Sequence, residues 1–120
     1  MTLPTLTIEV TPTLVIAGAL ATRDFQDVHH DRDRAVARGS KDIFLNILTT
    51  TGLVQQYVLE WDPSATITHI SLKLGVPCYA NDTLTFTGRV TSVDGDVTTV
   101  EVVGANSLGA HVTATVGVRR

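Results

Sequence analysis

Hydrophobic and polar positions repeat with one period in the middle of the chain and with another after it. From Ile43 to Trp61, apolar residues recur at three- and four-residue spacing, which is typical of a helix with one buried stripe. The expected stripe consists of Phe44, Ile47, Leu48, Leu53, Val54 and Val58. Because the step "TTTG" within it has low helix propensity, we expect burial to hold this helix together.

After Pro63 the period changes to two, which predicts half-buried strands. Four segments alternate in this way, separated by an Asp94-Gly95 turn and by the turn "GANSLGA": Ile67–Leu74, Leu84–Val93, Thr98–Ala105 and His111–Val118. An additional strand at Leu14–Leu20 would complete a five-stranded sheet. Strands that cluster after helices favour an α+β fold, in which a curved antiparallel sheet wraps around the one long helix.

Length and composition limit the classes of protein to which the chain can belong. The chain has 120 residues, enough for a single domain over 1–120 with one core, and that core must be aliphatic because aromatic residues reach only 5%. A formal charge of −3 without a Lys/Arg cluster indicates neither a nucleic acid nor an anionic membrane as a partner. We expect no signal peptide, no membrane span and, with Cys78 alone, no internal disulfide. The expected location is the cytoplasm.

The segment "RDFQDVHHDRD", residues 23 to 33, concentrates the titratable side chains. Part of it predicts a short solvated helix, with Asp31 as the N-cap and Gly39 as the stop. We expect no metal site, because the adjacent His29 and His30 point apart and no other metal-binding motif is present. Asp24 and His29 are five residues apart, so a turn could bring them together around a water molecule. The spacing alone does not distinguish this pair from an ordinary loop histidine.

The stretch "TRDFQDVHHDRDRAVARG" resembles the hydratase motif of the MaoC-like, R-specific enoyl-CoA hydratases, S/T-G-D-x-N-P-x-H-x-D followed by a small residue. Thr22, Asp24, His29, Asp31 and Ala35 fall on matching positions. The resemblance implies a hot-dog fold over most of the chain. "GSKDIFLNILTTTGLVQ" and "LGVPCYANDTLTFTG" further resemble the small subunits of the heteromeric hydratases of actinobacterial steroid side-chain degradation.

By this resemblance, the chain adds water across the trans-2 double bond of an acyl-CoA, and the acyl group that it implies is a steroid side chain. Asp24 acts as general base on the water, His29 shares that water, and coenzyme A belongs to the substrate, so no separate cofactor is expected. The same resemblance implies a second, larger MaoC-like subunit, in a heterodimer or a dimer of heterodimers. The residues themselves show only that one such unit leaves a sheet edge open.

The chain departs from the motif at Arg23, Gln26 and Asp27, which replace its Gly, Asn and Pro, so we expect a rebuilt turn. The family's His-Gly at the start of the central helix is also missing. We therefore expect a backbone N–H in the region from Gly39 to Asn46 to bind the thioester oxygen, because a helix start presents unpaired donors. Gly39, Asn46 and His30 are the expected substrate-binding residues.

Three other functions compete with hydration. A hot-dog acyl-CoA thioesterase normally carries its carboxylate on the central helix, where Asp42 is the only nearby acid. The chain could instead be a non-catalytic structural subunit of a hydratase complex, although a silent copy has no reason to keep both Asp24 and His29. A third alternative is a sterol-binding module without turnover.

Overall fold

The computed structural model describes every residue of the chain, from 1 to 120. In chain order its elements are β1 (Thr2–Val10), α1 (Pro12–Ala21), the short 3-10 helix η1 (Asp27–His29), α2 (Arg32–Ala37), α3 (Ile47–Trp61), β2 (Thr66–Leu74), β3 (Asp82–Asp94), β4 (Val97–Asn106) and β5 (Gly109–Arg119). The four strands predicted after the long helix are confirmed, and so is the short helix behind its Asp31 cap.

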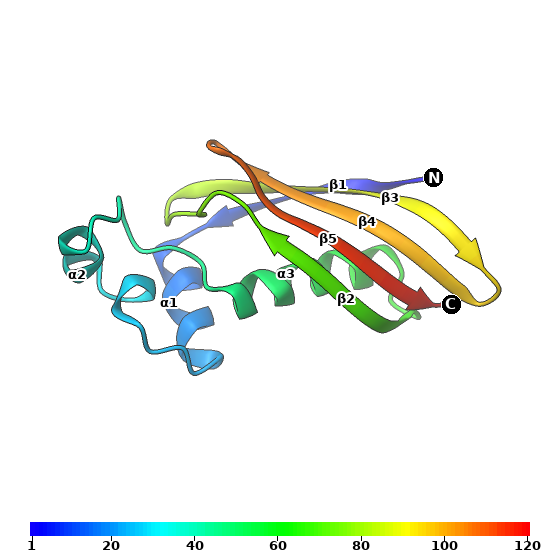
Figure 1. Cartoon of the computed structure of the whole chain (residues 1–120), viewed down its shortest axis with the longest axis horizontal. Coiled ribbons are helices and arrows are strands. Elements are labelled where there is room, and N and C mark those ends of the chain that lie inside the picture. The colour runs from blue at the N-terminus through cyan, green and yellow to red at the C-terminus, as the bar shows by residue number, and fades with distance from the viewer.

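The strands form one antiparallel sheet in the order β1-β3-β4-β5-β2. In Figure 1 this sheet curves along α3, while α1 and α2 lie together beyond one end of it. Both β1 and β2 are edge strands, since each pairs with only one neighbour. The architecture is the α+β hot-dog fold, in which a curved five-stranded sheet packs on one long helix.

The core lies between α3 and the concave face of the sheet. Three residues of the predicted stripe, Leu53, Val54 and Val58, are buried as expected. The prediction is wrong for Ile47 and Leu48, which lie in the first turn of the helix and are 50% and 54% exposed. The sheet contributes its alternating aliphatic side chains to the same cluster, among them Leu84, Phe86, Val100, Val102, Val112, Ala114, Val116 and Val118.

The strand predicted at Leu14–Leu20 is wrong, since these residues lie in α1. The Thr11 side chain accepts a hydrogen bond from the Leu14 N–H, and Pro12 occupies the first turn, where its missing N–H costs nothing. The fifth strand of the sheet is instead β1. It tolerates Pro4 because it is an edge strand.

The long helix begins at Ile47, four residues later than predicted. Ile43 and Leu45 are both buried with a less buried Phe44 between them, which is the alternation of extended chain. This segment pairs with residues 78–80, through the Leu45 N–H to the Cys78 carbonyl among other bonds. Asn46 then caps α3, because its side chain accepts the Thr49 N–H.

One face assignment in β2 is also corrected. A strict period of two over Ile67–Leu74 puts Ile67 on the same face as His69, yet Ile67 packs against the core with Ile70 and Leu72, and His69 is exposed. The register of β2 against β5 shifts between Ile67 and His69. Such an irregularity inverts the side-chain alternation, which a strict period of two cannot anticipate.

His111 is buried inside the fold and joins β5 to α3. Its Nδ1 lies 2.7 Å from the Val76 carbonyl oxygen, so that nitrogen carries the proton, and Nε2 accepts the Thr50 hydroxyl at 2.8 Å. Burial lowers the pKa of His111 below its ordinary 6.5, against the opposite effect of the Val76 carbonyl. The folded protein therefore holds this imidazole neutral.

We expect the free energy of unfolding to fall with acidification below about pH 6.5, because the unfolded state then binds a proton that the folded state excludes. Above pH 6.5 this contribution is fully present. One such group changes the free energy by at most about 1.4 kcal/mol per pH unit. Urea unfolding of wild type and His111→Gln between pH 5 and 8 measures it. An equally steep slope in the variant would contradict the assignment to His111.

No helix of the structure combines the length and the apolar composition that a membrane crossing needs. Cys78 is fully buried, and burial raises the pKa of its thiol. Its thiolate is therefore disfavoured, which argues against a nucleophilic role.

Candidate active site

The end of α1 places Asp24. The Asp24 N–H donates to the Ala19 carbonyl at 2.9 Å, and the Arg23 N–H donates to the Leu20 carbonyl at 3.1 Å. These two bonds form a Schellman motif, whose penultimate residue must take a left-handed conformation. Arg23 does so, with φ of 59°, where the family motif has Gly. A non-glycine residue there costs roughly 1–2 kcal/mol. The rebuilt turn expected from Arg23, Gln26 and Asp27 stays a prediction.

Gly18 allows α1 to approach α3 closely enough to bring Asp24 beside the start of that helix. A Cβ at Gly18 would lie 2.7 Å from Cγ2 of Thr49 and closer still to its hydroxyl. Thr49 cannot rotate away freely, because its hydroxyl also bonds to the Asn46 side chain.

We expect Gly18→Ala to destabilise the fold by about 1–3 kcal/mol, the usual cost of overpacking, and to lower turnover by displacing Asp24. The matched control is Gly52→Ala, in the middle of α3, where an added Cβ meets nothing within 4 Å. That change should stabilise the helix by roughly 0.5–1 kcal/mol. Chemical unfolding of both variants measures the difference, and a stabilising Gly18→Ala would show that the helices are not in tight contact.

His29 is held by the extended segment that precedes α3. Its Nδ1 lies 2.8 Å from the Phe44 carbonyl oxygen, and its ring meets the Phe44 ring edge to face, with centroids 4.9 Å apart. A carbonyl only accepts, so Nδ1 carries a proton. In the neutral imidazole, Nε2 then has a free lone pair. The His29 side chain is 8% exposed, so its orientation is fixed by packing as well as by this bond.

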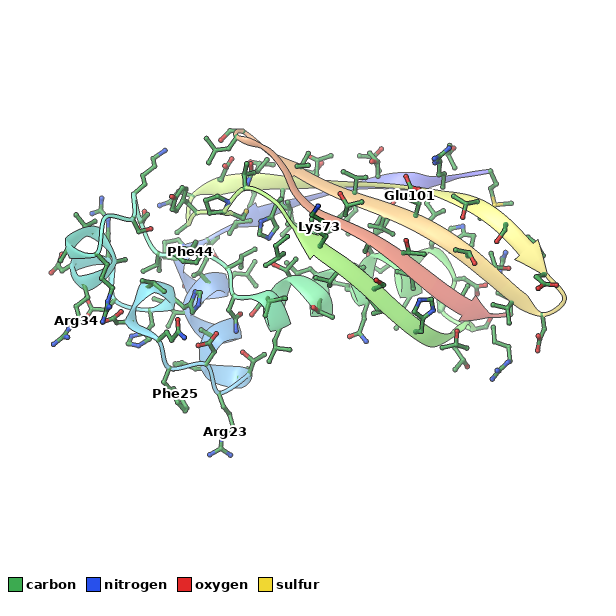
Figure 2. All side chains as sticks on the ribbon, viewed as in Figure 1. Arg23, Phe25, Arg34, Phe44, Lys73 and Glu101 are labelled. Carbon is green, nitrogen blue, oxygen red and sulfur yellow. The ribbon has the colours of Figure 1, made fainter.

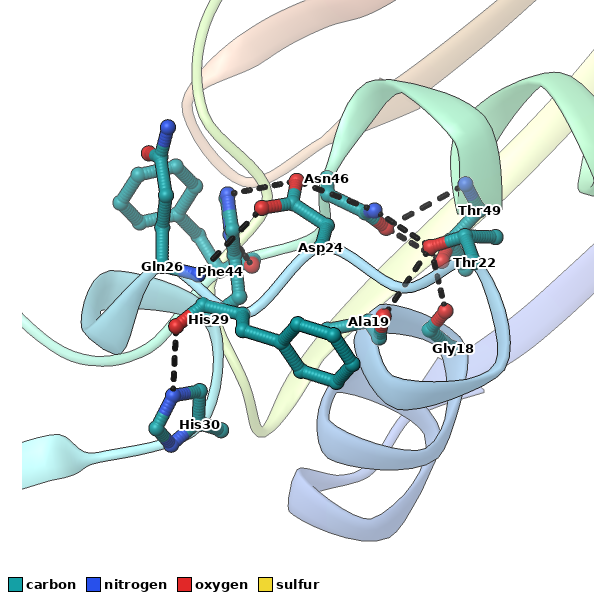
Figure 3. Close-up of polar contacts among 11 residues, drawn as sticks. Gly18, Ala19, Thr22, Asp24, Gln26, His29, His30, Phe44, Asn46 and Thr49 are labelled. Carbon is teal, nitrogen blue, oxygen red and sulfur yellow. Dashed lines mark hydrogen bonds and ion pairs between the residues drawn. The ribbon is translucent and has the colours of Figure 1, made fainter.

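Asp24 and His29 face each other, an arrangement that their spacing allowed and that the resemblance implied. Oδ2 of Asp24 lies 3.5 Å from Nε2 of His29, and the Asp24 side chain is 27% exposed. Figure 3 shows the carboxylate between the imidazole and the side chain of Asn46. Two proton acceptors thus meet at one partly accessible point, which is the arrangement that can bind and deprotonate a water molecule.

The substrate-binding residues expected from the sequence lie in three different places. Asn46 is at the pair, but its side chain is buried and bonded within the protein. Gly39 ends α2 with φ of 94° and shares no hydrogen bond with Asp24 or His29. His30 points apart from His29, as expected, and its Nε2 lies 3.1 Å from the Phe25 carbonyl oxygen.

Sequence reasoning missed two features of the site. One is the Phe44 carbonyl, which selects the tautomer of His29 and leaves no trace in the sequence. The other is a pair of backbone donors: the N–H groups of Ile47 and Leu48, at the start of α3, have no acceptor within the chain. The polar residue Asn46 before an apolar run was a usable signal for that helix start.

The site is open in the single chain. None of the five surface depressions includes Asp24 or His29, and the largest, of about 650 Å³, lies beside His30 and the arginines of α2. Figure 2 shows Arg23 and Phe25, the sequence neighbours of Asp24, projecting away from the body of the protein. Phe25 is 62% exposed, and Leu20, Ile47 and Leu48 are also exposed. Apolar side chains so exposed around a polar site are typical of a surface that another molecule covers.

The charges around the depression beside His30 largely neutralise one another. Arg38 makes two contacts with the Asp27 carboxylate, at 2.8 and 3.1 Å, and lowers the pKa of that carboxyl. Arg34 lies within 4 Å of both Asp27 and Asp31. The solvated helix start predicted for these charges is confirmed. No group of three or more His, Cys, Asp and Glu side chains converges with metal-binding geometry.

Comparison with known proteins identifies the family. The 3-oxo-4,17-pregnadiene-20-carboxyl-CoA hydratase beta subunit of Mycobacterium tuberculosis (strain ATCC 25618 / H37Rv) is 65% identical over 115 residues, which span 95% of this chain and 89% of the relative. A chain in the crystal structure of the ChsH1-ChsH2 complex from Mycobacterium tuberculosis is 62% identical, with a TM-score of 0.96 over 99% of this chain and 94% of that one. This chain belongs to the MaoC-like hydratases. Comparison with protein-family models gives no match.

More distant MaoC-like structures confirm the fold. The R-hydratase PhaJ1 from Pseudomonas aeruginosa has a TM-score of 0.90 at 15% identity, and the match covers 99% of this chain and 79% of that one. An (R)-hydratase from A. caviae also has a TM-score of 0.90, at 18% identity, over 99% of this chain and 93% of that one. The hot-dog fold predicted from the resemblance is therefore confirmed.

Proposed function

We propose that this chain is the catalytic small subunit of an enoyl-CoA hydratase, with Asp24 and His29 as its acid–base pair. The observation that carries the proposal is the distance of 3.5 Å between Asp24 Oδ2 and His29 Nε2. Because Nδ1 carries the proton of the neutral ring, Nε2 is free to accept a hydrogen bond from water. Family membership supports the reaction class, since the 65% identical relative is named a hydratase.

Asp24 and His29 bind the attacking water molecule through the two O–H groups of the water. His29 Nε2 accepts one O–H, and Asp24 removes the other proton as the oxygen bonds to C3 of the enoyl thioester. The electrons of the C2–C3 double bond move onto the thioester oxygen, forming an enolate. The pair then returns a proton to C2, the enolate collapses to the carbonyl, and a 3-hydroxyacyl thioester results. No cofactor is needed, because water is the second substrate.

The enolate oxygen is stabilised by the start of α3. The N–H groups of Ile47 and Leu48 are unpaired and lie at the positive end of a 15-residue helix. Donors already fixed by the fold are worth roughly 10² to 10³ in rate, since they need no reorganisation during the reaction. We assign the oxyanion donors to these two groups. Gly39, which follows the end of α2, and His30, whose ring contacts the Phe25 carbonyl, stay predictions as substrate contacts.

The proposed substrate is an α,β-unsaturated steroid side-chain ester of coenzyme A. This follows the name of the relative, a 3-oxo-4,17-pregnadiene-20-carboxyl-CoA hydratase subunit. Exposed apolar residues beside Asp24, among them Leu20 and Phe25, agree with an extended apolar acyl group but do not select it. The cytoplasmic location expected from the sequence stays a prediction.

A second, larger MaoC-like subunit completes the site, in a heterodimer or a dimer of heterodimers. The 62% identical chain was solved within a two-component complex, ChsH1-ChsH2. Here the catalytic pair lies outside any enclosed cavity, and strands β1 and β2 leave two sheet edges unpaired. A partner that covers the α3 start and the loop at Phe25 would exclude water from the reaction and hold the acyl chain.

The decisive experiment identifies the product. We would co-express the chain with a larger MaoC-like subunit, confirm the complex by native mass spectrometry, and supply the unsaturated steroid side-chain CoA ester. Hydration produces a 3-hydroxyacyl-CoA that is heavier by one water, while hydrolysis releases free coenzyme A thiol. Release of thiol without the hydrated ester would overturn the proposal in favour of a thioesterase.

The thioesterase alternative has little support from the geometry. Asp42 lies before α3 and not on it, and its Oδ1 accepts the Ile43 N–H at 2.7 Å and contacts Arg32 at 3.5 Å. A carboxylate engaged in this way is a poor nucleophile or base. The helix itself offers no other acid until Glu60, in its last turn.

A further inference from the structure

Asn46 contacts both the catalytic turn at Asp24 and the first turn of α3, and it makes more hydrogen bonds than helix capping requires. Its side chain is 2% exposed and makes polar contacts on both sides of the amide. The Oδ1 atom accepts the Thr49 N–H and the Thr49 hydroxyl. The Nδ2 atom donates to the Thr22 hydroxyl at 2.8 Å and to Asp24 Oδ2 at 3.3 Å.

These partners fix which way the amide points. The Thr49 N–H is an obligate donor, so the oxygen of Asn46 must face the helix and its NH₂ group must face Asp24. Thr22 accepts from Asn46 because its own hydroxyl donates back to the Gly18 carbonyl at 2.8 Å. Both N–H bonds of the amide are therefore used, one on Thr22 and one on the carboxylate.

Asn46 contacts the same carboxylate oxygen that approaches His29. Asp24 Oδ2 lies 3.3 Å from Asn46 Nδ2 and 3.5 Å from His29 Nε2, while Oδ1 receives only a long 3.4 Å bond from the Gln26 N–H. A carboxylate on an exposed turn would otherwise rotate freely about its last torsion. The amide of Asn46 anchors it from the buried side, and the lone pairs that remain face the open side.

We propose that Asn46 is a positioning residue that orients the Asp24 carboxylate toward the reacting water. This inference rests on the proposed function. It assigns Asn46 a role through Asp24 in place of the direct substrate contact expected from the sequence. It also explains why the helix start and the catalytic turn lie together, since one side chain caps the first and holds the second.

Two variants separate positioning from capping. Asn46→Asp keeps an N-cap oxygen for the Thr49 N–H but places a second carboxylate against Asp24. Asn46→Ser also keeps a capping oxygen, but its shorter side chain has no second polar atom to reach Asp24. We expect a melting temperature near that of wild type for Asn46→Ser and a lower one for Asn46→Asp, because the latter buries a second carboxylate beside Asp24. We expect kcat to fall about tenfold to hundredfold with KM nearly unchanged, the range for losing a hydrogen bond to a charged group.

The pH–rate profile gives a readout that a structural role would not move. In Asn46→Asp the acid limb should move to higher pH, because a neighbouring carboxylate disfavours loss of the proton from the pair. The only other titratable side chain in contact with Asp24 is His29, from η1. Thr11→Ala, which removes the cap of α1 at an exposed position, is the control for a generic loss of helix stability. Wild-type kcat in both Asn46 variants would overturn the proposal.

A second measurement does not depend on turnover. The side-chain amide resonances of Asn46 in an ¹⁵N–¹H NMR spectrum should shift as pH is lowered through the titration of Asp24, and this shift should vanish in Asp24→Asn. If wild-type protein hydrates no substrate but the amide follows Asp24, the proposed function fails while the contact stands. An amide resonance that ignores both pH and Asp24→Asn overturns the positioning role whatever the activity.

Discussion

Replacing Asp24 by Asn should reduce hydratase turnover by about 10² to 10⁴-fold, the range that a positioned general base contributes. Asn has the shape of Asp but cannot take a proton from water. The bond from Asn46 reaches a side-chain oxygen that the substituted amide also has, so the fold and the α3 cap should persist. Steady-state kinetics of the co-expressed complex, with native mass spectrometry to show that it still assembles, measures the effect.

The matched control is Asp33→Asn, an exposed acid of α2 that forms no ion pair in the structure. It changes the net charge equally and should leave kcat within about twofold, as expected for a surface substitution away from the site. Full turnover in Asp24→Asn would move catalysis to the partner and make this chain its structural subunit. A comparable loss in both variants would indicate a general charge effect.

Much of the fold could be predicted because its strands alternate cleanly. Val112, Ala114 and Val116 of β5 are buried in the order that the sequence shows. The prediction failed where two patterns look alike. The apolar run from Leu14 to Leu20 is as compatible with a helix as with a strand, and only the Thr11-Pro12 start distinguishes them.

The start of α3 was also predicted wrongly, because a helical and an extended pattern look alike over a few residues. Phe44 and Ile47 fit a three-residue spacing, so the helical pattern could be extended back across a segment that is actually extended. What decides the start is Asn46, whose side chain accepts the Thr49 N–H, together with the preceding segment, which pairs with residues 78–80 and so stays extended. That pairing joins parts of the chain more than thirty residues apart, and no local pattern contains it.

At the site, the sequence predicted the two catalytic residues but not the contacts that hold them in place. The meeting of Asp24 and His29 follows from the motif. The left-handed conformation of Arg23 does not, because Arg has no preference for it. It is imposed by the two Schellman bonds at the end of α1, and so depends on that helix forming. The contact of Asn46 with Asp24 likewise needs α1 and α3 to pack closely at Gly18.

His29 should be nearly as important for turnover as Asp24, but its loss should also affect stability. The imidazole does two things: Nε2 faces the water site, and Nδ1–H satisfies the Phe44 carbonyl. His29→Ala removes both, so it should cut turnover by about 10² or more. It should also cost about 1–3 kcal/mol of stability, because it leaves a part-buried carbonyl without its donor.

His29→Asn separates the two roles. The Asn amide can donate to the Phe44 carbonyl from nearly the position of Nδ1, but it places nothing at the position of Nε2. We therefore expect His29→Asn to lose turnover almost as far as His29→Ala while keeping more of the stability. Kinetics and urea unfolding of both variants, with His69→Asn on exposed β2 as the histidine control, measure this. If His29→Asn turned over like wild type, Nε2 would have no part in the reaction, and Asp24 alone would have to activate the water.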